Sequence, residues 1–176
     1  MPLSRWWGLG ALGCYAVHAA YHVHRGHPED LVWACHVGTL LVAFGLAARS
    51  PVANAIGFLW LVVGNVCWAM DLAAGGDFLP TSILTHAGGL VLGALGLRRM
   101  GLPRHAWWQA LVGFVLLQQL SRWTTPPDAN VNVAFRVWTG WEARFPSYPA
   151  YLAMLYAIAL ASFFVIDRVA RRLLLP

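Results

Sequence analysis

The sequence contains no lysine, and each of its 12 basic residues is arginine. This excludes Schiff-base chemistry on a lysine, including a retinal linkage. Only 11% of the residues are charged, against about 25% in a soluble domain. The three cysteines form no Cys-x-x-Cys pair, so no disulfide framework is expected. The net charge of +5 comes without a basic run or a stacking motif, which argues against a nucleic-acid partner and for an anionic lipid surface.

What the chain has instead is apolar length, because 59% of its 176 residues are hydrophobic. About 20 residues cross the hydrocarbon layer as a helix, and six runs approach that length. The sequence therefore predicts an all-α polytopic membrane protein, with residues 1–176 forming a single domain of six transmembrane helices. The six runs are Trp6–Val23, Leu31–Ala48, Pro51–Met70, Pro80–Leu97, His105–Leu120 and Tyr148–Asp167.

The arginines predict the orientation of these helices, because basic residues collect on the cytoplasmic side. Eight arginines lie at one set of helix ends and four at the other, so both termini are expected in the cytoplasm. The expected location is the inner (plasma) membrane of the cell. The larger set is Arg5, Arg49, Arg98, Arg99, Arg104, Arg168, Arg171 and Arg172, and the smaller set is Arg25, Arg122, Arg136 and Arg144.

One connection is long, and it lies on the extracytoplasmic side of this topology. Residues 121–147 begin with a turn signal and continue into Val131–Glu142, whose apolar residues are near helical spacing. This segment is expected to form an interfacial helix on the membrane, to cap the bundle as a lid, or to serve only as an amphipathic connector.

The stretch Pro80–Gly89 reads as the entry of the fourth helix. Pro80 suits a first helical turn, and the hydroxyls of Thr81 and Ser82 are expected to satisfy free amides there. His86 then lies one turn inside the hydrocarbon layer. Burying a titratable ring there costs free energy, so its presence indicates a functional site. Gly89 and Gly93 form a Gly-x-x-x-Gly face that permits close approach of another helix.

Every predicted helix places polar side chains at one level in the outer leaflet, whereas the inner half has few. This asymmetry predicts a pocket that opens outward or sideways into the outer leaflet. The alternatives are a core histidine bonded to a carbonyl for His86, and plain packing for Cys35. The residues at this level are His18, His22, Cys35, His36, Asn65, Cys67, Asp71, Thr85, His86, Gln118, Gln119, Arg122, Tyr148 and Tyr151.

Three chemistries fit this level. Cys35 as a thiolate with His86 as its base would support nucleophilic catalysis. His18 and His22, four residues apart on one helix face, could bind a metal or haem together with His36 and His86. Cys35 and Cys67 fall at similar depth on adjacent antiparallel helices and could form a redox disulfide.

The pattern resembles the YwaF-like integral membrane proteins, relatives of transmembrane lysophospholipid acyltransferases, and more distantly the androgen-induced membrane lipid-ester hydrolases. The features that carry the resemblance are His18, Leu31–Cys35, the helix from Gly57 to Met70, the Asp71–Ser82 link, His86–Gly88 and Phe145–Tyr151. The resemblance implies acyl transfer or hydrolysis on a lipid, with Cys35 as nucleophile and His86 as base. The chain departs from the family pattern where His36 follows Cys35 instead of preceding it.

The first hypothesis is therefore a lipid-acting acyltransferase or hydrolase without a cofactor, with membrane lipid as its partner and no nucleic acid. The second, from a different class, is a metal- or haem-binding membrane subunit that uses His18, His22, His36 and His86. A homo-oligomer or a membrane-complex partner stays open. The residues expected to bind substrate or stabilise an oxyanion are His18, His22, His36, Asn65, Asp71, Thr85, Gln119, Arg122, Asn130 and Asn132.

Overall fold

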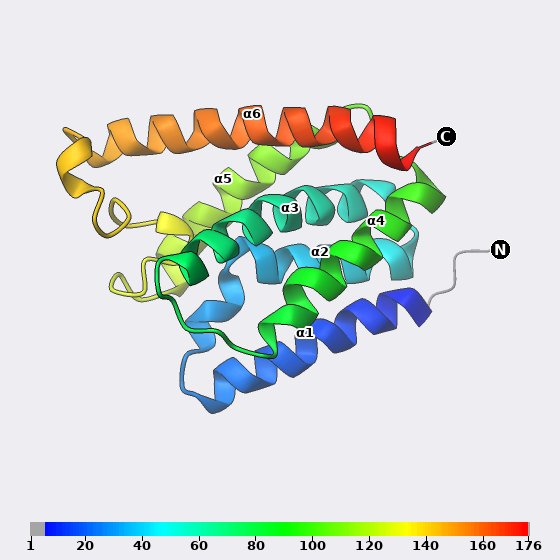
Figure 1. The fold of residues 1–176 in the computed structure, drawn as a ribbon, viewed down its shortest axis with the longest axis horizontal. Coiled ribbons are helices and arrows are strands. Elements are labelled where there is room, and N and C mark those ends of the chain that lie inside the picture. Colours follow the sequence, from blue (N-terminus) through cyan, green and yellow to red (C-terminus); the bar gives the residue numbers. More distant parts are fainter. Residues whose placement is uncertain (1–5, 176) are drawn as a thin grey trace.

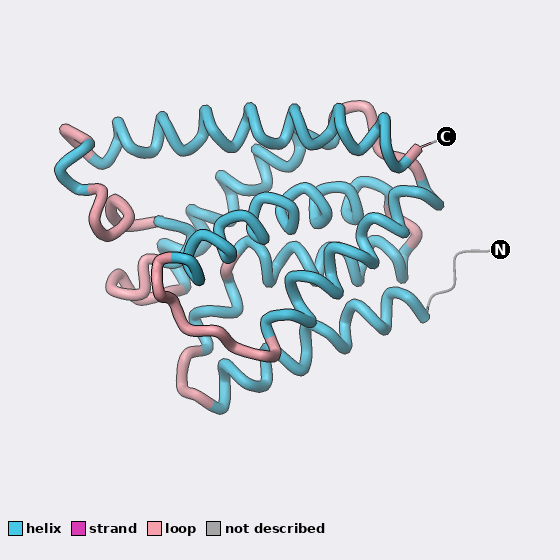
Figure 2. Tube along the Cα trace, in the orientation of Figure 1, coloured by secondary structure: helices cyan, strands magenta, loops and turns pink. Residues whose placement is uncertain are grey.

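A computed structural model describes residues 6–175, and in these it is all-helical, with 78% helix and no strand. These residues form six α-helices. Figure 1 shows their arrangement, and Figure 2 shows the loops that join them. The α-helices are α1 (Trp6–His24), α2 (Ala34–Ala48), α3 (Pro51–Ala73), α4 (Gly89–Met100), α5 (Ala106–Thr124) and α6 (Tyr148–Leu174). Short turns complete the fold: the 3₁₀ turns η1 (Pro28–Val32), η3 (Val131–Val133) and η4 (Glu142–Arg144), and the π-helical turn η2 (Leu84–Gly88).

The helices run alternately in opposite directions, so α1 begins and α6 ends at the same end of the bundle (Figure 1). The longer links, after α1, α3 and α5, lie at the opposite end (Figure 2). The predicted six-helix, all-α architecture is confirmed for residues 6–175. By length and apolar composition, α3 and α6 could each cross a membrane, and α2 is a shorter apolar helix. Arg5, predicted at the end where α1 begins, lies outside the described residues.

Helices α2 and α3 form the tightest contact of the bundle, and glycine makes it possible. Arg49 adopts a left-handed conformation that ends α2, and the Ser50 hydroxyl accepts a hydrogen bond from the Ala53 amide to begin α3. A Cβ added at Gly45 would lie 2.5 Å from the Asn54 nitrogen. Larger residues at this crossing would therefore force the two backbones apart.

The fourth helix begins differently from the expectation. The Ser82 hydroxyl donates to the Leu79 carbonyl, and the Thr81 hydroxyl contacts His18, so neither satisfies a backbone amide of the first turn. The chain then widens into the π-helical turn Leu84–Gly88 before α4. The predicted close approach at Gly89 is confirmed, since a Cβ there would lie 2.6 Å from the Thr39 hydroxyl on α2.

The long link after α5 caps the bundle, which is one of the three alternatives expected for it, and it does not form the helix expected over Val131–Glu142. Only the turns η3 and η4 are helical in this region. Val131 and Ala134 are fully buried, and Asn130 and Asn132 have positive φ angles. A continuous helix does not form, because the segment folds inward onto the ends of α2 and α5 through side-chain-to-backbone hydrogen bonds.

At the other end of the molecule, a buried ion pair joins α6 to the link before α5. The Asp167 carboxylate is 1% exposed and accepts hydrogen bonds from Arg171 at 2.7 and 3.0 Å. The same guanidinium donates to the carbonyls of Leu102 and Pro103. The Arg171 side chain therefore supplies hydrogen bonds to a buried carboxylate and to two backbone carbonyls.

We predict that Arg171→Ala lowers the free energy of unfolding by about 3 kcal/mol, because it leaves the Asp167 charge without a partner. Thermal unfolding of the detergent-purified protein measures the effect. Arg172→Ala is the matched control, since the neighbouring side chain is exposed. Equal destabilisation by the two variants would contradict the assigned role of the ion pair.

Candidate functional site: a cluster of histidines

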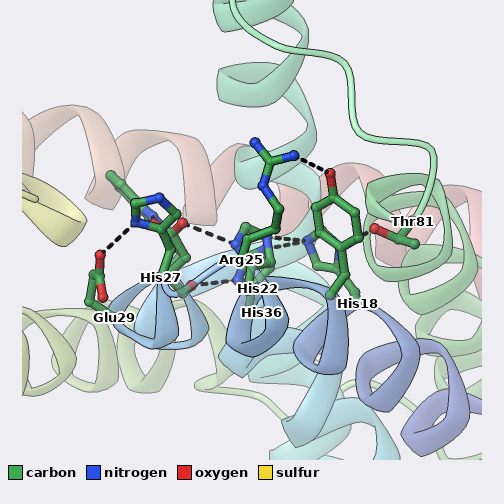
Figure 3. Close-up of polar contacts among 10 residues, drawn as sticks. His18, His22, Arg25, His27, Glu29, His36 and Thr81 are labelled. Atoms are coloured by element: carbon green, nitrogen blue, oxygen red, sulfur yellow. Dashed lines mark hydrogen bonds and ion pairs between the residues drawn. The ribbon is translucent and has the colours of Figure 1, made fainter.

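Three buried imidazoles meet at the end of the bundle that carries the longer links. His18 and His22 come from α1, and His36 comes from the first turn of α2. The Nε2 atom of His18 lies 3.0 Å from Nε2 of His36 and 3.2 Å from Nε2 of His22. The three residues are 2–8% exposed. Figure 3 shows them grouped over α1. We call His18, His22 and His36 the histidine triad.

The outward-facing nitrogen of each triad ring contacts an oxygen. Nδ1 of His22 lies 3.0 Å from a carboxylate oxygen of Asp30, and Nδ1 of His36 lies 2.6 Å from the Asp30 backbone carbonyl. Nδ1 of His18 lies 2.9 Å from the Thr81 hydroxyl (Figure 3). Asp30 also accepts from the Trp33 indole at 3.0 Å. The three Nδ1 atoms are thus held by outer partners, while the three Nε2 atoms face one another.

Local structure explains why these rings meet. Residues four apart share one face of a helix, and on α1 the buried residues Gly8, Ala11, His18 and His22 form the face that packs on the rest of the bundle. The 3₁₀ turn η1, begun by Pro28, returns the chain from α1 to α2 and brings Asp30 over the ring of His22.

The triad has too few protons to satisfy all of its Nε2 contacts, so a cation can bind between these nitrogens. A carbonyl and a carboxylate are acceptors, so the neutral rings of His36 and His22 donate from Nδ1 and present a lone pair at Nε2. The neutral ring of His18 carries a single proton, which can serve at most one of its two N···N contacts. Lone pairs that converge in this way are the usual arrangement of metal-ligating histidines, whose outer nitrogens are held by carboxylates, carbonyls or hydroxyls.

A second group adjoins the triad and shares His36 with it. The ligand atoms of Cys35, His36 and His86 all lie within 4.8 Å of one another. His86 is 3% exposed, and its ring stacks on Trp68 at a centroid distance of 4.7 Å. Its Nδ1 atom is buried without a hydrogen-bond partner among the described residues. In residues 6–175 no hydrogen bond joins the Cys35 thiol to the His86 ring.

The π-helical turn η2 positions His86, and two neighbouring helices hold the turn. Asn65 on α3 donates to the His86 carbonyl at 3.2 Å, and Thr39 on α2 donates to the Thr85 carbonyl at 3.0 Å. The Thr85 side chain is buried. Such π-helical turns are frequent at functional sites, because they turn a side chain away from regular helical register. Asn65 and Thr85 therefore support the ring of His86 through the backbone.

In residues 6–175 no hydrogen bond joins the other predicted site residues to a histidine of the triad or to His86. The Asn132 side-chain oxygen accepts from the Ala34 amide, and its nitrogen donates to the Val32 carbonyl and the Ser121 hydroxyl. Asn130 accepts from the amides of Phe135 and Arg136 and donates to the Arg136 carbonyl. Arg122 donates to the Ala134 carbonyl. Asp71 is exposed at the end of α3, and Gln119 is partly exposed.

This arrangement corrects the prediction of a single polar chamber. The polar side chains of α5 and α6 face the long link: Gln118 donates to the Asn132 carbonyl, Tyr156 donates to Gln118, and Tyr148 donates to the Val133 carbonyl. Nε of Arg122 and the side-chain amides of Asn130 and Asn132 hold the cap, and the oxyanion or head-group role expected for these residues stays a prediction. Cys35 and Cys67 are both free thiols in the structure.

Sequence reasoning missed three partners of the histidines: Asp30, Trp68, and Thr81 as a contact of His18. A carboxylate directly before the second apolar run, and a hydroxyl at the second residue of the run that carries His86, were the available signals. The neighbouring Glu29 belongs elsewhere, since it contacts His27 at 3.1 Å. The pKa of the Glu29 carboxyl is lowered by a hydrogen bond from its own backbone amide and then by His27.

Comparisons of the chain with protein-family models, with curated proteins and with solved structures returned no match. The resemblance to the YwaF-like proteins therefore stays a prediction, and the site is interpreted from its own geometry.

We predict that Asn132→Ala lowers the free energy of unfolding by about 2 kcal/mol, because a buried amide, a carbonyl and a hydroxyl lose their partner. Chemical denaturation in detergent, followed by tryptophan fluorescence, measures the change. Asp128→Ala removes an exposed polar side chain from the same link and is expected to have little effect. A stability of Asn132→Ala equal to that of the control would show that the amide does not hold the cap.

Proposed function

We propose that the protein is a membrane metalloprotein that binds a divalent transition-metal ion through Nε2 of His18, His22 and His36. The observation that carries this proposal is the convergence of three buried Nε2 atoms whose Nδ1 partners are all oxygens. Imidazole suits Zn²⁺, Cu²⁺, Ni²⁺ and iron. Three histidines with an open fourth position are typical of a reactive zinc centre.

The spacing of the nitrogens supports an ion of this size. Zn–N bonds of about 2.0–2.1 Å in a tetrahedral shell separate the ligand nitrogens by about 3.3 Å. The contacts of 3.0 and 3.2 Å in the triad are close to this separation. Binding an ion between them requires only a small outward movement of the rings, and it replaces repulsion between lone pairs by coordination.

Two earlier alternatives receive less support from this geometry. A haem iron takes axial ligands from opposite faces of its macrocycle, and nitrogens 3.0 Å apart leave no space for a porphyrin between them. The Cys35–His86 acyl-transfer mechanism lacks a thiol–imidazole hydrogen bond in the described residues. The side-chain amides of Asn130 and Asn132, two of the groups expected to stabilise its oxyanion, donate to backbone carbonyls instead.

The membrane setting is part of the proposal: six helices span the plasma membrane, with both termini cytoplasmic and the triad near the extracytoplasmic side. The apolar composition of α3 and α6 supports it, as do large exposed apolar side chains on the outer helices, such as Phe44, Leu116 and Ile158. A shallow apolar groove between α5 and α6, lined by Trp107, Leu160 and Phe164 among others, suits a lipid acyl chain. Lipid is then the surrounding partner of the metal site.

We predict that the purified protein binds one equivalent of Zn²⁺, and that His36→Ala weakens binding at least 100-fold, because only two nitrogen ligands of the triad remain. Isothermal titration calorimetry and elemental analysis after dialysis measure affinity and stoichiometry. His24→Ala is the matched control, since His24 is an exposed histidine on α1. Folded wild-type protein that binds no Zn²⁺, Co²⁺, Ni²⁺, Cu²⁺ or Fe²⁺ would overturn the proposed function.

We predict that Asp30→Asn weakens Zn²⁺ binding about 10- to 100-fold, the range found for outer partners of metal-bound histidines. The carboxylate holds Nδ1–H of His22 and makes its Nε2 a better donor to the ion. Glu29→Gln is the control, because the adjacent carboxylate contacts His27 and not the triad. Competition with a chromogenic chelator measures both variants, and equal affinities would exclude this role of Asp30.

A further inference from the structure

We infer that Cys35, His36 and His86 form a second metal-binding position, and that the triad and this position share His36 and exchange one ion. This inference rests on the proposed function of the triad. It starts from the proximity of the three ligand atoms, which lie within 4.8 Å of one another. A thiolate and two imidazoles form a donor set suited to zinc and, as a softer site, to Cu(I).

An independent feature of His86 points to a ligand. His86 is only 3% exposed, yet its Nδ1 atom has no hydrogen-bond partner in residues 6–175. Buried polar atoms are nearly always satisfied in folded proteins. Stacking on Trp68 fixes the plane of the ring, and the π-helical turn η2 determines its direction. The ring is therefore oriented in advance, with one nitrogen left for an ion.

The two positions exclude each other because His36 offers only one ligand atom. Its Nδ1 atom donates to the Asp30 carbonyl at 2.6 Å, so only the Nε2 lone pair is available. One lone pair binds one ion. The ion is thus held either with His18 and His22 or with Cys35 and His86, and the ring of His36 stays bound in both states.

The exchange moves the ion across the bundle, from α1 toward α3. His18 and His22 belong to α1, whereas the ligands of the second position lie against α3: a Cβ added at Gly64 would be 2.8 Å from Cβ of Cys35, and His86 stacks on Trp68. In the transfer, the bonds from the ion to His18 and His22 break and bonds to Sγ and to the His86 nitrogen form. The thiol proton moves to a released histidine nitrogen, so charge and protons balance without an oxidant.

The test uses Co²⁺, which replaces Zn²⁺ and gives a near-ultraviolet charge-transfer band when a thiolate binds it. The full-length protein is titrated in detergent as wild type, as His18→Ala/His22→Ala, and as the same double variant with Cys35→Ala. We expect the wild type to bind one equivalent, and the double variant to bind one equivalent with a strong thiolate band that Cys35→Ala removes. His24→Ala/His105→Ala, which removes two exposed histidines, is the matched control.

The outcomes separate this inference from the proposed function. A wild type that binds one equivalent, with a folded double variant that binds none or shows no thiolate band, overturns the second position and leaves the triad intact. A wild type that binds two equivalents overturns the sharing of His36. A wild type that binds no ion removes the triad, and with it the exchange.

A second measurement decides the question where His18→Ala/His22→Ala does not fold. In a Cys14→Ala/Cys67→Ala chain, Cys35 is the single thiol, and its rate of alkylation is measured with and without Zn²⁺. We expect Zn²⁺ to slow alkylation at least fivefold and His86→Ala to abolish the effect. An unchanged rate, or protection that persists without His86, overturns the second position.

Discussion

The contact among the Nε2 atoms of His18, His22 and His36 is the constraint on which the end of the bundle with the longer links depends. It joins α1 to α2, and through Asp30 and Thr81 it joins both to the links before α2 and α4. The neutral rings supply at most one proton for the two N···N contacts of about 3 Å, so at least one contact is unfavourable without a cation. The arrangement gains stability when a cation occupies the centre, and this is why metal binding is the function we propose.

Around this contact, the bundle divides its polar residues into two groups with separate tasks. The histidines, Cys35 and their partners lie among α1, α2, α3 and the turn η2. The side chains of Gln118, Arg122 and Asn132 hold the cap onto α5 and onto the first turn of α2. The two groups meet at Ala34, whose amide is satisfied by Asn132 one residue before Cys35. The cap thereby stabilises the turn of α2 that carries His36.

Much of the helical framework could be predicted from the sequence, because apolar runs of about 20 residues and their Gly and Pro boundaries are local signals. Pro51 and Ser50 begin α3 as their chemistry indicates, and Gly89 lies against α2 as expected. The cap over Val131–Glu142 could not be predicted in this way. Helical spacing of its apolar residues favoured a helix, but the bonds of Asn130 within the link and the long-range bonds of Asn132 outweighed that preference.

From the sequence alone it follows that His18 and His22 share a helix face, and that His36 and His86 lie at similar positions along neighbouring helices. The rotation of each helix about its axis follows only from the folded structure, because packing against neighbours sets it rather than local spacing. That rotation directs His36 toward His18 and leaves Nδ1 of His86 without a partner among the described residues, while the fold of the long link brings Asn132 to the backbone of α2. Depth along a helix follows from counting residues, whereas direction around it follows from contacts that no single segment contains.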